Sequence, residues 1–175
     1  MSEEITPPFD RSEPEHTSSH RVVAGLGATR EACLELLRQA EIEVELFSYD
    51  LDPLLFDQEP FIEAAKAFLL RHRNNRILLL LQTSERIQKE GHRLIDLAQR
   101  LPSKVEIRRP APEYSGRVDS FLVVDKRGFV RLKQHGHLET ELDLNNRLEA
   151  GKLHALFREM WERGTPEIDL RRLSL

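Results

Sequence analysis

Histidine side chains are the residues of this sequence best suited to chemistry, and two of them are close together. His135 and His137 are two residues apart, so on a strand both imidazoles would leave the same face and could bind a metal ion. Asp143 or His154 would have to complete the ligand set, because the sequence has neither paired cysteines nor a His-Glu-x-x-His motif. The polar surroundings of the pair are typical of a solvated loop, so we predict no metal site and no cofactor.

A third histidine, His92, and three aspartates are further candidates. His92 could approach a phosphate group, although a surface position on an amphipathic helix is the simpler interpretation. Asp50, Asp52 and Asp57 follow a predicted strand, and the carboxyl ends of strands in α/β sheets often hold ligands. The Asp-x-Asp-Pro sequence is equally typical of a turn that opens a helix, so these aspartates have a structural interpretation as well.

Basic residues are concentrated in one part of the sequence. If they share a face of the folded chain, they could hold an anionic group through charge-assisted hydrogen bonds. Few aromatic residues lie among them, which disfavours the stacking used to bind single-stranded nucleic acid, and a solvated strand face is the simpler interpretation. The residues are Arg108, Arg109, Arg117, Lys126, Arg127, Arg131 and Lys133.

The overall composition narrows the classes of protein. The chain of 175 residues has 26 Lys and Arg against 30 Asp and Glu, a net charge of −4, so it lacks the global positive field that attracts nucleic acid. The only cysteine, Cys33, falls among apolar residues, which predicts a small core residue and a reducing compartment. No apolar run approaches the roughly 18 residues of a membrane span. We predict a cytoplasmic protein that does not contact membranes.

The beginning of the chain differs from the rest. Residues 1–20 contain Pro7, Pro8 and Pro14 among Glu, Ser and Thr, with few apolar side chains, which predicts a disordered tail. A chain of this length supports one hydrophobic core, and the sequence has no internal repeat. We therefore expect residues 21–175 to form a single domain.

Beyond the tail, hydrophobic periodicity predicts helices alternating with strands. Glu41, Glu43 and Glu45 alternate with apolar residues, which predicts a strand whose beginning has one solvated face. Residues 77–81 are apolar without alternation, as in a strand covered on both faces. The expected helices are 28–40, capped by Thr29, then 60–69, 84–101 and 147–163, and the expected strands are 42–49, 77–81, 105–108, 118–125, 129–132 and 142–144. This order predicts an α/β sandwich with a mixed central sheet flanked by helices.

One stretch supports a comparison with a known family. Val118–Asp125 contains the continuous apolar run Phe121–Val124 and is followed by a basic turn and a second strand. Together with the leucine-rich strand before it, this arrangement resembles one half of the phospholipase D superfamily, over residues 28–163. That superfamily places the motif His-x-Lys-x-x-x-x-Asp on such a strand and its following turn. Asn146-x-x-Glu149 and the helix after it resemble the superfamily's closing segment.

The resemblance implies that this motif is degenerate. Val118 takes the position of the nucleophilic histidine, Ser120 takes that of the lysine, and Asp125 is retained. In the family mechanism the histidine attacks phosphorus, while the lysine neutralises charge on the non-bridging oxygens. Valine has no lone pair and serine has no positive charge, so the loss in rate would be many powers of ten.

The resemblance also implies a partner. A working site in the superfamily brings two motifs together, and without an internal repeat the second copy would come from a homodimer. We therefore expect a non-catalytic phospholipase D-like half-domain that serves as a binding or assembly module, similar to a little-described bacterial family of motif-poor halves. Glu113, Tyr114 and Arg117 precede the motif strand, where the superfamily's cleft opens, so they are the expected rim of a pocket for a phosphate-containing ligand. An ordinary loop is the alternative.

Two other functions stay open at this point. A diverged phosphodiesterase or phosphotransferase could recruit His92, His135 or His137 in place of the missing pair, which requires one of them near a common phosphate site. The basic strands could instead bind nucleic acid weakly, although the net charge argues against it, and such binding would fall steeply with salt.

Overall fold

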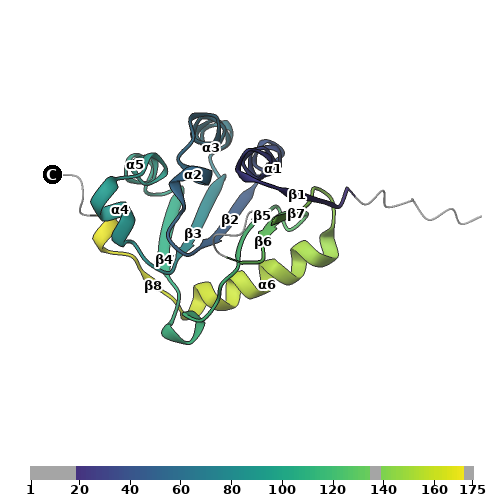
Figure 1. The fold of residues 1–175 in the computed structure, drawn as a ribbon. Helices are drawn as coiled ribbons and strands as arrows, with labels where there is room; N and C mark the ends of the chain where they lie inside the picture. Colours follow the sequence, from purple (N-terminus) through teal and green to yellow (C-terminus); the bar gives the residue numbers. More distant parts are fainter. Residues whose placement is uncertain (1–18, 135–138, 172–175) are drawn as a thin grey trace, which may run out of the picture.

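The computed structural model describes residues 19–134 and 139–171. Within these residues the strands form an eight-stranded mixed sheet in the order β1-β7-β6-β5-β2-β3-β4-β8 (Figure 1). Residues 1–18, which make up most of the expected disordered tail 1–20, lie outside the described residues, as do His135 and His137.

The element order largely follows the predicted alternation of helices and strands. The strands are β1 (Arg21–Ala24), β2 (Glu43–Ser48), β3 (Arg76–Leu81), β4 (Val105–Arg109), β5 (Ser120–Val124), β6 (Gly128–Leu132), β7 (Glu139–Asp143) and β8 (Thr165–Pro166). The helices are α1 (Leu26–Arg38), α2 (Pro53–Phe56), α3 (Glu59–Arg71), α4 (Glu85–Glu90), α5 (Arg93–Arg100) and α6 (Arg147–Arg163), with short 3₁₀ turns η1 (Pro112–Tyr114) and η2 (Asp169–Arg171).

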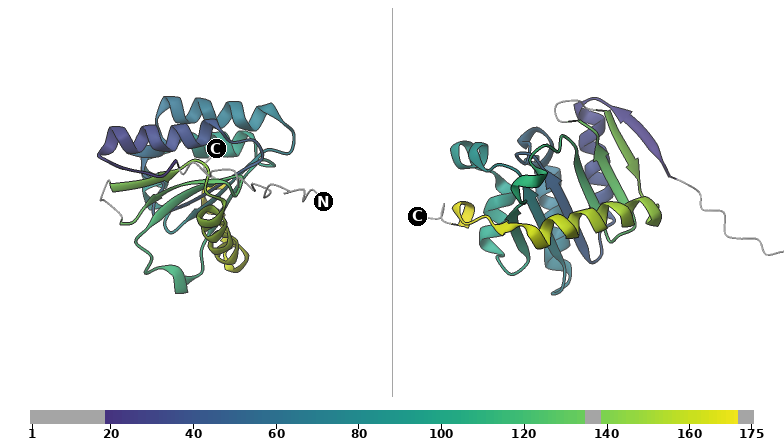
Figure 2. Two further views of the ribbon diagram at one scale, coloured as in Figure 1. Left: turned by 90° about the vertical axis from the view of Figure 1, so that its right-hand side faces the viewer. Right: turned by 90° about the horizontal axis from the view of Figure 1, so that it is seen from below.

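The sheet lies between two layers of helix, which confirms the predicted α/β sandwich. Helices α1, α2, α3 and α5 cover one face, and α6 runs across the other (Figures 1 and 2). Each face has its own hydrophobic core. The core under α6 is rich in aromatic rings, with Phe47, Phe121, Phe157 and Trp161 packed together. Among the helices that the structure describes, none combines the length and the apolar character needed to cross a bilayer.

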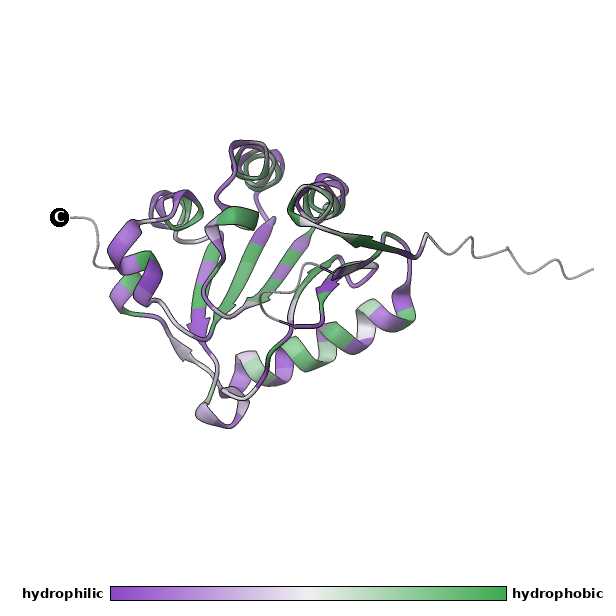
Figure 3. Cartoon of the chain, viewed as in Figure 1, coloured by the Kyte–Doolittle hydropathy of each residue, from purple (hydrophilic) through white to green (hydrophobic). Residues whose placement is uncertain are grey.

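The central strands explain why the apolar runs lack alternation. Strand β3 pairs in parallel with β2 and β4, and helices on both sides leave neither of its faces in water. Its residues Ile77, Leu79 and Leu81 enter one core, while Leu78 and Leu80 enter the other. Figure 3 shows the hydrophobic residues gathered on these central strands.

The predicted hairpin after the apolar run is present. Strand β5 pairs antiparallel with β2 on one side and with β6 on the other. The turn between β5 and β6 contains Asp125 and Lys126, both with positive φ (53° and 54°). An aspartate tolerates this left-handed conformation better than most residues, which suits Asp125 to the end of the strand.

Several local predictions are wrong at the N-terminal side. Helix α1 begins at Leu26 after Gly25, whose φ is 91°, so Thr29 does not cap it. The Thr29 hydroxyl is buried and hydrogen-bonds the Thr140 hydroxyl of β7 at 2.7 Å. Strand β1 was not expected, and it pairs antiparallel with β7 at the edge of the sheet.

The predicted helix 84–101 is two helices. Helix α4 ends at Gly91, whose φ of 74° turns the chain, and α5 starts after His92. The imidazole Nδ1 of His92 accepts a hydrogen bond from the backbone N–H of Leu94 at 3.1 Å. His92 is therefore the N-cap of α5 and is 4% exposed, which corrects its expected surface position.

Candidate functional site

The predicted motif positions, Val118, Ser120 and Asp125, span the length of strand β5. Val118 lies in the loop before the strand and is 59% exposed, so the expected interior strand over 118–125 is shorter than predicted. Ser120 is the first residue of β5, and Asp125 follows its last residue. A strand of this length places Val118 and Asp125 about 20 Å apart. The three positions therefore cannot act on one ligand atom.

Asp125 has a structural role at its end of β5. Its carboxylate accepts hydrogen bonds from the backbone N–H groups of Glu41 (2.8 Å), Ile42 (2.9 Å) and Glu43 (2.8 Å). The Asp125 backbone N–H also donates to the Glu43 carbonyl at 3.0 Å. Asp125 thus fastens the chain entering β2 to the β5–β6 turn.

Two arginines and an aspartate lie near Val118 at the other end. Asp119 forms an ion pair with Arg117 at 2.7 Å and a longer one with Arg131 of β6 at 3.7 Å. The guanidinium of Arg117 also lies over the Phe47 ring, 5.8 Å from its centroid. These three residues carry two positive charges and one negative charge, and the acidic Glu141 of β7 lies directly across the sheet from Arg131. The partly exposed guanidinium groups could attract an anion.

The predicted pocket rim is divided between two places. Glu113 accepts a hydrogen bond from Arg163 at 2.9 Å, and the Tyr114 hydroxyl donates to Glu159 at 3.0 Å. Both contacts tie η1 to the last turns of α6. Arg117, in contrast, is paired with Asp119 at the entry to β5.

The three aspartates after β2 serve local structure. Asp52 accepts a hydrogen bond from the backbone N–H of Leu54 and caps α2. Asp50 forms an ion pair with Arg86 at 3.3 Å, and Asp57 forms one with Arg93 at 2.6 Å. These contacts support the turn interpretation of the Asp-x-Asp-Pro sequence.

The basic residues of the sequence cluster do not converge on one site. Lys126 and Arg127 follow β5, at the end of the strand opposite Arg117. Arg108 stacks on the Trp161 ring, 4.6 Å from its centroid, and donates to the Trp161 carbonyl. Arg109 pairs with Glu167 at 2.8 Å. The cluster in sequence is thus separated in space.

A buried polar cluster under α6 was missed by the sequence reasoning. Glu45, expected on a solvated face, has a side chain that is 2% exposed. Its carboxylate contacts Nδ1 of His154 at 2.9 and 3.0 Å and Nε of Arg158 at 3.1 Å. Arg158 also donates to Glu43 at 2.7 Å, and Arg76 pairs with the other oxygen of Glu43.

The electrostatics of this cluster shift several proton affinities. Burial raises the pKa of Glu45 to about 8, with a further rise from the negative charge of Glu43 and an opposing effect of Arg158. Burial also acts to raise the pKa of Glu43, but Arg158 and Arg76 outweigh it, so that pKa is lowered. Burial lowers the pKa of His154, and the nearby charges of Lys126 and Arg158 lower it further.

The same groups are close enough for a cation to be considered. Possible ligand atoms of Glu43, Glu45 and His154 all lie within 4.8 Å of one another. However, Arg158 donates to both carboxylates, so a cation would have to displace a guanidinium that already neutralises them. The arrangement suits an ion-pair network better than a metal centre.

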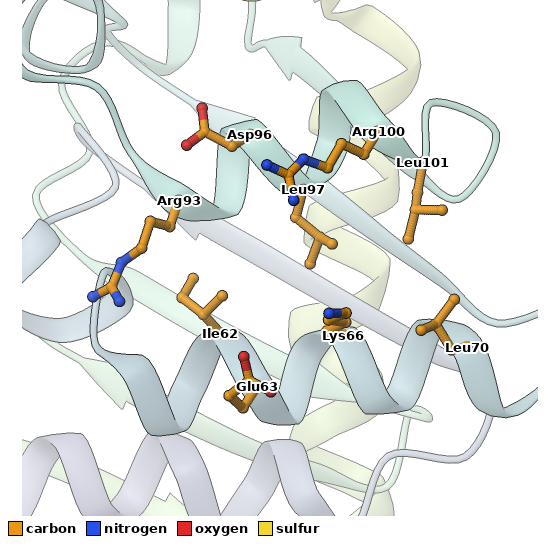
Figure 4. Close-up of a pocket in the computed structure, with 9 residues that line it drawn as sticks. All are labelled: Ile62, Glu63, Lys66, Leu70, Arg93, Asp96, Leu97, Arg100 and Leu101. Carbon is orange, nitrogen blue, oxygen red and sulfur yellow. The ribbon is translucent and has the colours of Figure 1, made fainter.

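A surface groove lies between α3 and α5 in the other helix layer. Its volume is about 320 Å³. Figure 4 shows Ile62, Leu70, Leu97 and Leu101 pointing into the space between the two helices, with charged residues of both signs around them. None of the predicted site residues lines this groove.

The buried thiol shows no sign of chemistry. Cys33 is fully buried in α1, as predicted from its apolar neighbours. Burial raises the pKa of this thiol to about 12. Thiols react as thiolates, so Cys33 is a core residue.

Comparison with known proteins supports the fold. A family model described as "Domain of unknown function (DUF7931)" matches residues 26–173, and a search of curated proteins gave no significant match. The structure of Nuc from Salmonella typhimurium, a phospholipase D family member, has a TM-score of 0.61 and 14% identity, covering 85% of this chain and 97% of that one. NucT from Helicobacter pylori has a TM-score of 0.58 and 10% identity, covering 85% and 99%.

An archaeal protein shares the same fold over part of its length. TrmBL2, an archaeal chromatin protein, has a TM-score of 0.61 and 18% identity over 89% of this chain. The chain spans only 56% of that structure. All of these identities are low, so the likeness concerns the fold, which is the phospholipase D-like fold expected from the sequence.

Proposed function

The chain belongs to the family of the domain of unknown function DUF7931, and we propose that it is a non-catalytic phospholipase D-like half-domain. In this proposal residues 21–175 form one domain that acts as a binding or assembly module. The observation that carries the proposal is the chemistry of the degenerate motif. Val118 and Ser120 stand where phosphoryl transfer would need a nucleophile and a cation.

The placement of the retained aspartate also supports a non-catalytic role. Asp125 is occupied by the backbone N–H groups of 41–43, so its presence is explained by folding alone. Near Val118, the charged groups at the β5 entry include Arg117, Asp119 and Arg131, and the Asp119 carboxylate is already paired with both arginines. A paired guanidinium is a poor nucleophile and a poor general base, because it is always protonated.

Hydrolysis of bis(p-nitrophenyl) phosphate tests the absence of catalysis. We expect purified protein to release no p-nitrophenol above the buffer rate. A rate that increases in proportion to protein concentration would contradict the proposal. If that rate is lost when His135 and His137 are both replaced by alanine, the relocated-histidine phosphodiesterase is the better assignment.

We propose that the module is a homodimer that pairs through the face around Val118. Val118 and Tyr49 are exposed there, at 59% and 44%, beside the entry to β5. Val118→Glu should raise the dimer dissociation constant in sedimentation velocity. The matched control is Leu148→Glu, because Leu148 is also exposed, at 71%. It lies in the first turn of α6, and this end of the helix is bonded to Arg127 at the opposite end of β5. A monomeric wild-type protein, or equal effects of both variants, would refute this interface.

The arginine pair of Arg117 and Arg131 is the proposed contact for a phosphate-containing ligand. Inorganic phosphate followed by ³¹P NMR line broadening is a suitable probe, and Arg131→Gln should weaken the broadening. Arg127→Gln is the control, because Arg127 lies at the far end of β5. No broadening with wild-type protein, or equal loss in both variants, would rule out this contact.

Nucleic-acid binding is the second candidate, favoured by the structural likeness to TrmBL2, which is described as binding DNA. Titration of fluorescent double-stranded DNA at about 50 and about 200 mM salt tests it, since phosphate contacts make affinity fall steeply with salt. The net charge of −4 and the separated basic residues lead us to expect a flat titration.

A further inference from the structure

Glu45 is an acidic residue in the middle of the sheet, under a helix that comes more than a hundred residues later. Its neighbours across the strands are Leu78 of β3 and Val123 of β5, both apolar. The row that Glu45 shares continues with Phe47, which is fully buried. Its carboxylate is held by His154 and Arg158 of α6. These contacts join the helix to the sheet at a point where hydrophobic packing would otherwise be continuous.

The charges around Glu45 favour retention of a proton. Arg158 makes its shorter contact (2.7 Å) with Glu43 and its longer contact (3.1 Å) with Glu45. Arg76 forms an ion pair with Glu43. Two carboxylates this close, one of them shut away from water, are unfavourable when both are ionised. The charged and titratable groups that face Glu45 come from β2, β3, the β5–β6 turn and α6. They are Glu43, Arg76, Lys126, His154 and Arg158.

We propose that the contact between Glu45 and His154 holds one proton beyond that of a neutral imidazole, and that loss of this proton weakens the docking of α6 on the sheet. The proton can lie on the carboxyl oxygen or on Nδ1, because the two atoms are within hydrogen-bond distance. The pair therefore titrates as a unit. Helix α6 is then a pH-sensitive cover over one face of the sheet.

The direction of the effect follows from proton counting. With α6 released, the pair would lose this proton at the usual histidine pKa of about 6.5. With α6 docked, the burial and charge effects described above hold the proton until the pH reaches about 8. Between these two values the docked state binds one more proton than the released state. Rising pH therefore favours release, by roughly 8-fold in the opening equilibrium between these two values and by roughly 30-fold over the whole titration.

Release of α6 would change the surface near the degenerate motif. The last turns of the helix hold η1 through the contacts of Glu159 with Tyr114 and of Arg163 with Glu113. The helix also covers Phe47 and Phe121. Opening would free η1 and expose an aromatic surface beside Arg117. This inference is independent of whether the chain is catalytic.

Hydrogen exchange measured by mass spectrometry tests the proposal on the full chain. After correction for the intrinsic exchange rate, the protection of peptides from 147–163 should fall roughly 8-fold between about pH 6.5 and about pH 8. Peptides from α3 should show no such fall. In Glu45→Gln, where a neutral amide of the same shape replaces the carboxyl, protection of α6 should be constant over this range. Glu162→Gln, an exposed position on α6, is the matched control and should behave as wild type.

Two results would overturn the proposal. One is constant α6 protection in the wild-type protein across this pH range. The other is an unchanged fall in Glu45→Gln. If that variant does not fold, a ¹³C NMR titration of the Glu45 side-chain carboxyl in wild-type protein decides the matter. We expect a midpoint near pH 8, and a midpoint below about 6 would refute the retained proton.

Discussion

Replacement of Asp125 should destabilise the fold and show that its carboxylate has a structural role. Asp125→Ala removes an acceptor of hydrogen bonds from the backbone N–H groups of Glu41, Ile42 and Glu43. Bonds to a charged acceptor contribute about 1.5 to 3 kcal/mol when buried. These bonds are partly open to water, so about 1 kcal/mol each is a reasonable value. Alanine at a φ of 53° adds about 1 kcal/mol of backbone strain.

The expected loss of unfolding free energy is therefore about 3 to 4 kcal/mol for Asp125→Ala, read from urea denaturation monitored by circular dichroism. Two further variants separate the contributions. Asp125→Asn keeps an acceptor oxygen and tolerates the positive φ, so it should lose only about 1 kcal/mol. Asp125→Gly removes the hydrogen bonds but relieves the strain, so it should be more stable than the alanine variant.

An Asp125→Ala protein within about 0.5 kcal/mol of wild type would contradict the structural role of this carboxylate. Glycine and alanine variants of equal stability would show that the positive φ costs nothing here. If Asp125→Ala is as stable as wild type while an activity or ligand affinity is lost, the carboxylate has a functional role that its backbone contacts do not explain.

Three more predictions follow from burial and charge. Phe157 is packed between Phe121 and Trp161, so Phe157→Ala should lower the unfolding free energy by about 3 to 5 kcal/mol. Leu148→Ala, at an exposed position, should change the unfolding free energy by less than about 0.5 kcal/mol. Equal effects of the two variants would contradict the packing of α6. Burial raises the pKa of Cys33 to about 12, so this thiol should not react with Ellman's reagent at neutral pH until urea unfolds the protein. Rapid reaction of the native protein would contradict the burial of Cys33. The folded Glu45 carboxyl keeps its proton to about pH 8, whereas the unfolded pair loses its shared proton near 6.5, so the unfolding free energy should fall by about 1.3 kcal/mol over that range. Glu45→Gln should abolish this fall, and an unfolding free energy that rises with pH would contradict the retained proton.

Most of the fold was predictable because its signals are local. The unbroken apolar run of β3 indicated a strand covered on both faces, and its residues enter both cores. The apolar run before Asp125 predicted a strand and a hairpin, which are β5 and β6. Sequence predicted these elements because each pattern reflects the immediate surroundings of its own residues.

The buried acidic cluster was not predictable from the same kind of pattern. Alternation of glutamate with apolar residues marked one face of β2 as different, but it could not say that α6 covers that face. The partner of Glu45 is His154, 109 residues later. One signal was present in the sequence: Glu45 and Phe47 lie on the same side of the strand, and a phenylalanine at the next position on that side favours a covered face.

The interpretation of His92 failed for a related reason. Periodicity over 84–101 suggested one helix with His92 on its surface, but Gly91 turns the chain and makes His92 an N-cap. Histidine is an uncommon N-cap residue, so the sequence around His92 did not indicate the start of α5. The strand that carries the predicted motif positions was therefore predictable from the sequence, while the polar contacts around it depended on tertiary structure.

The position of α6 in the chain has a consequence during protein synthesis. The ribosome completes every strand from β1 to β7 before it makes this helix. Until then the aromatic side of the sheet, including Phe47 and Phe121, has no cover. Such a nascent chain exposes a hydrophobic surface, which chaperones recognise and which promotes aggregation. Conditions that slow elongation just before residue 147 should therefore reduce the yield of native protein.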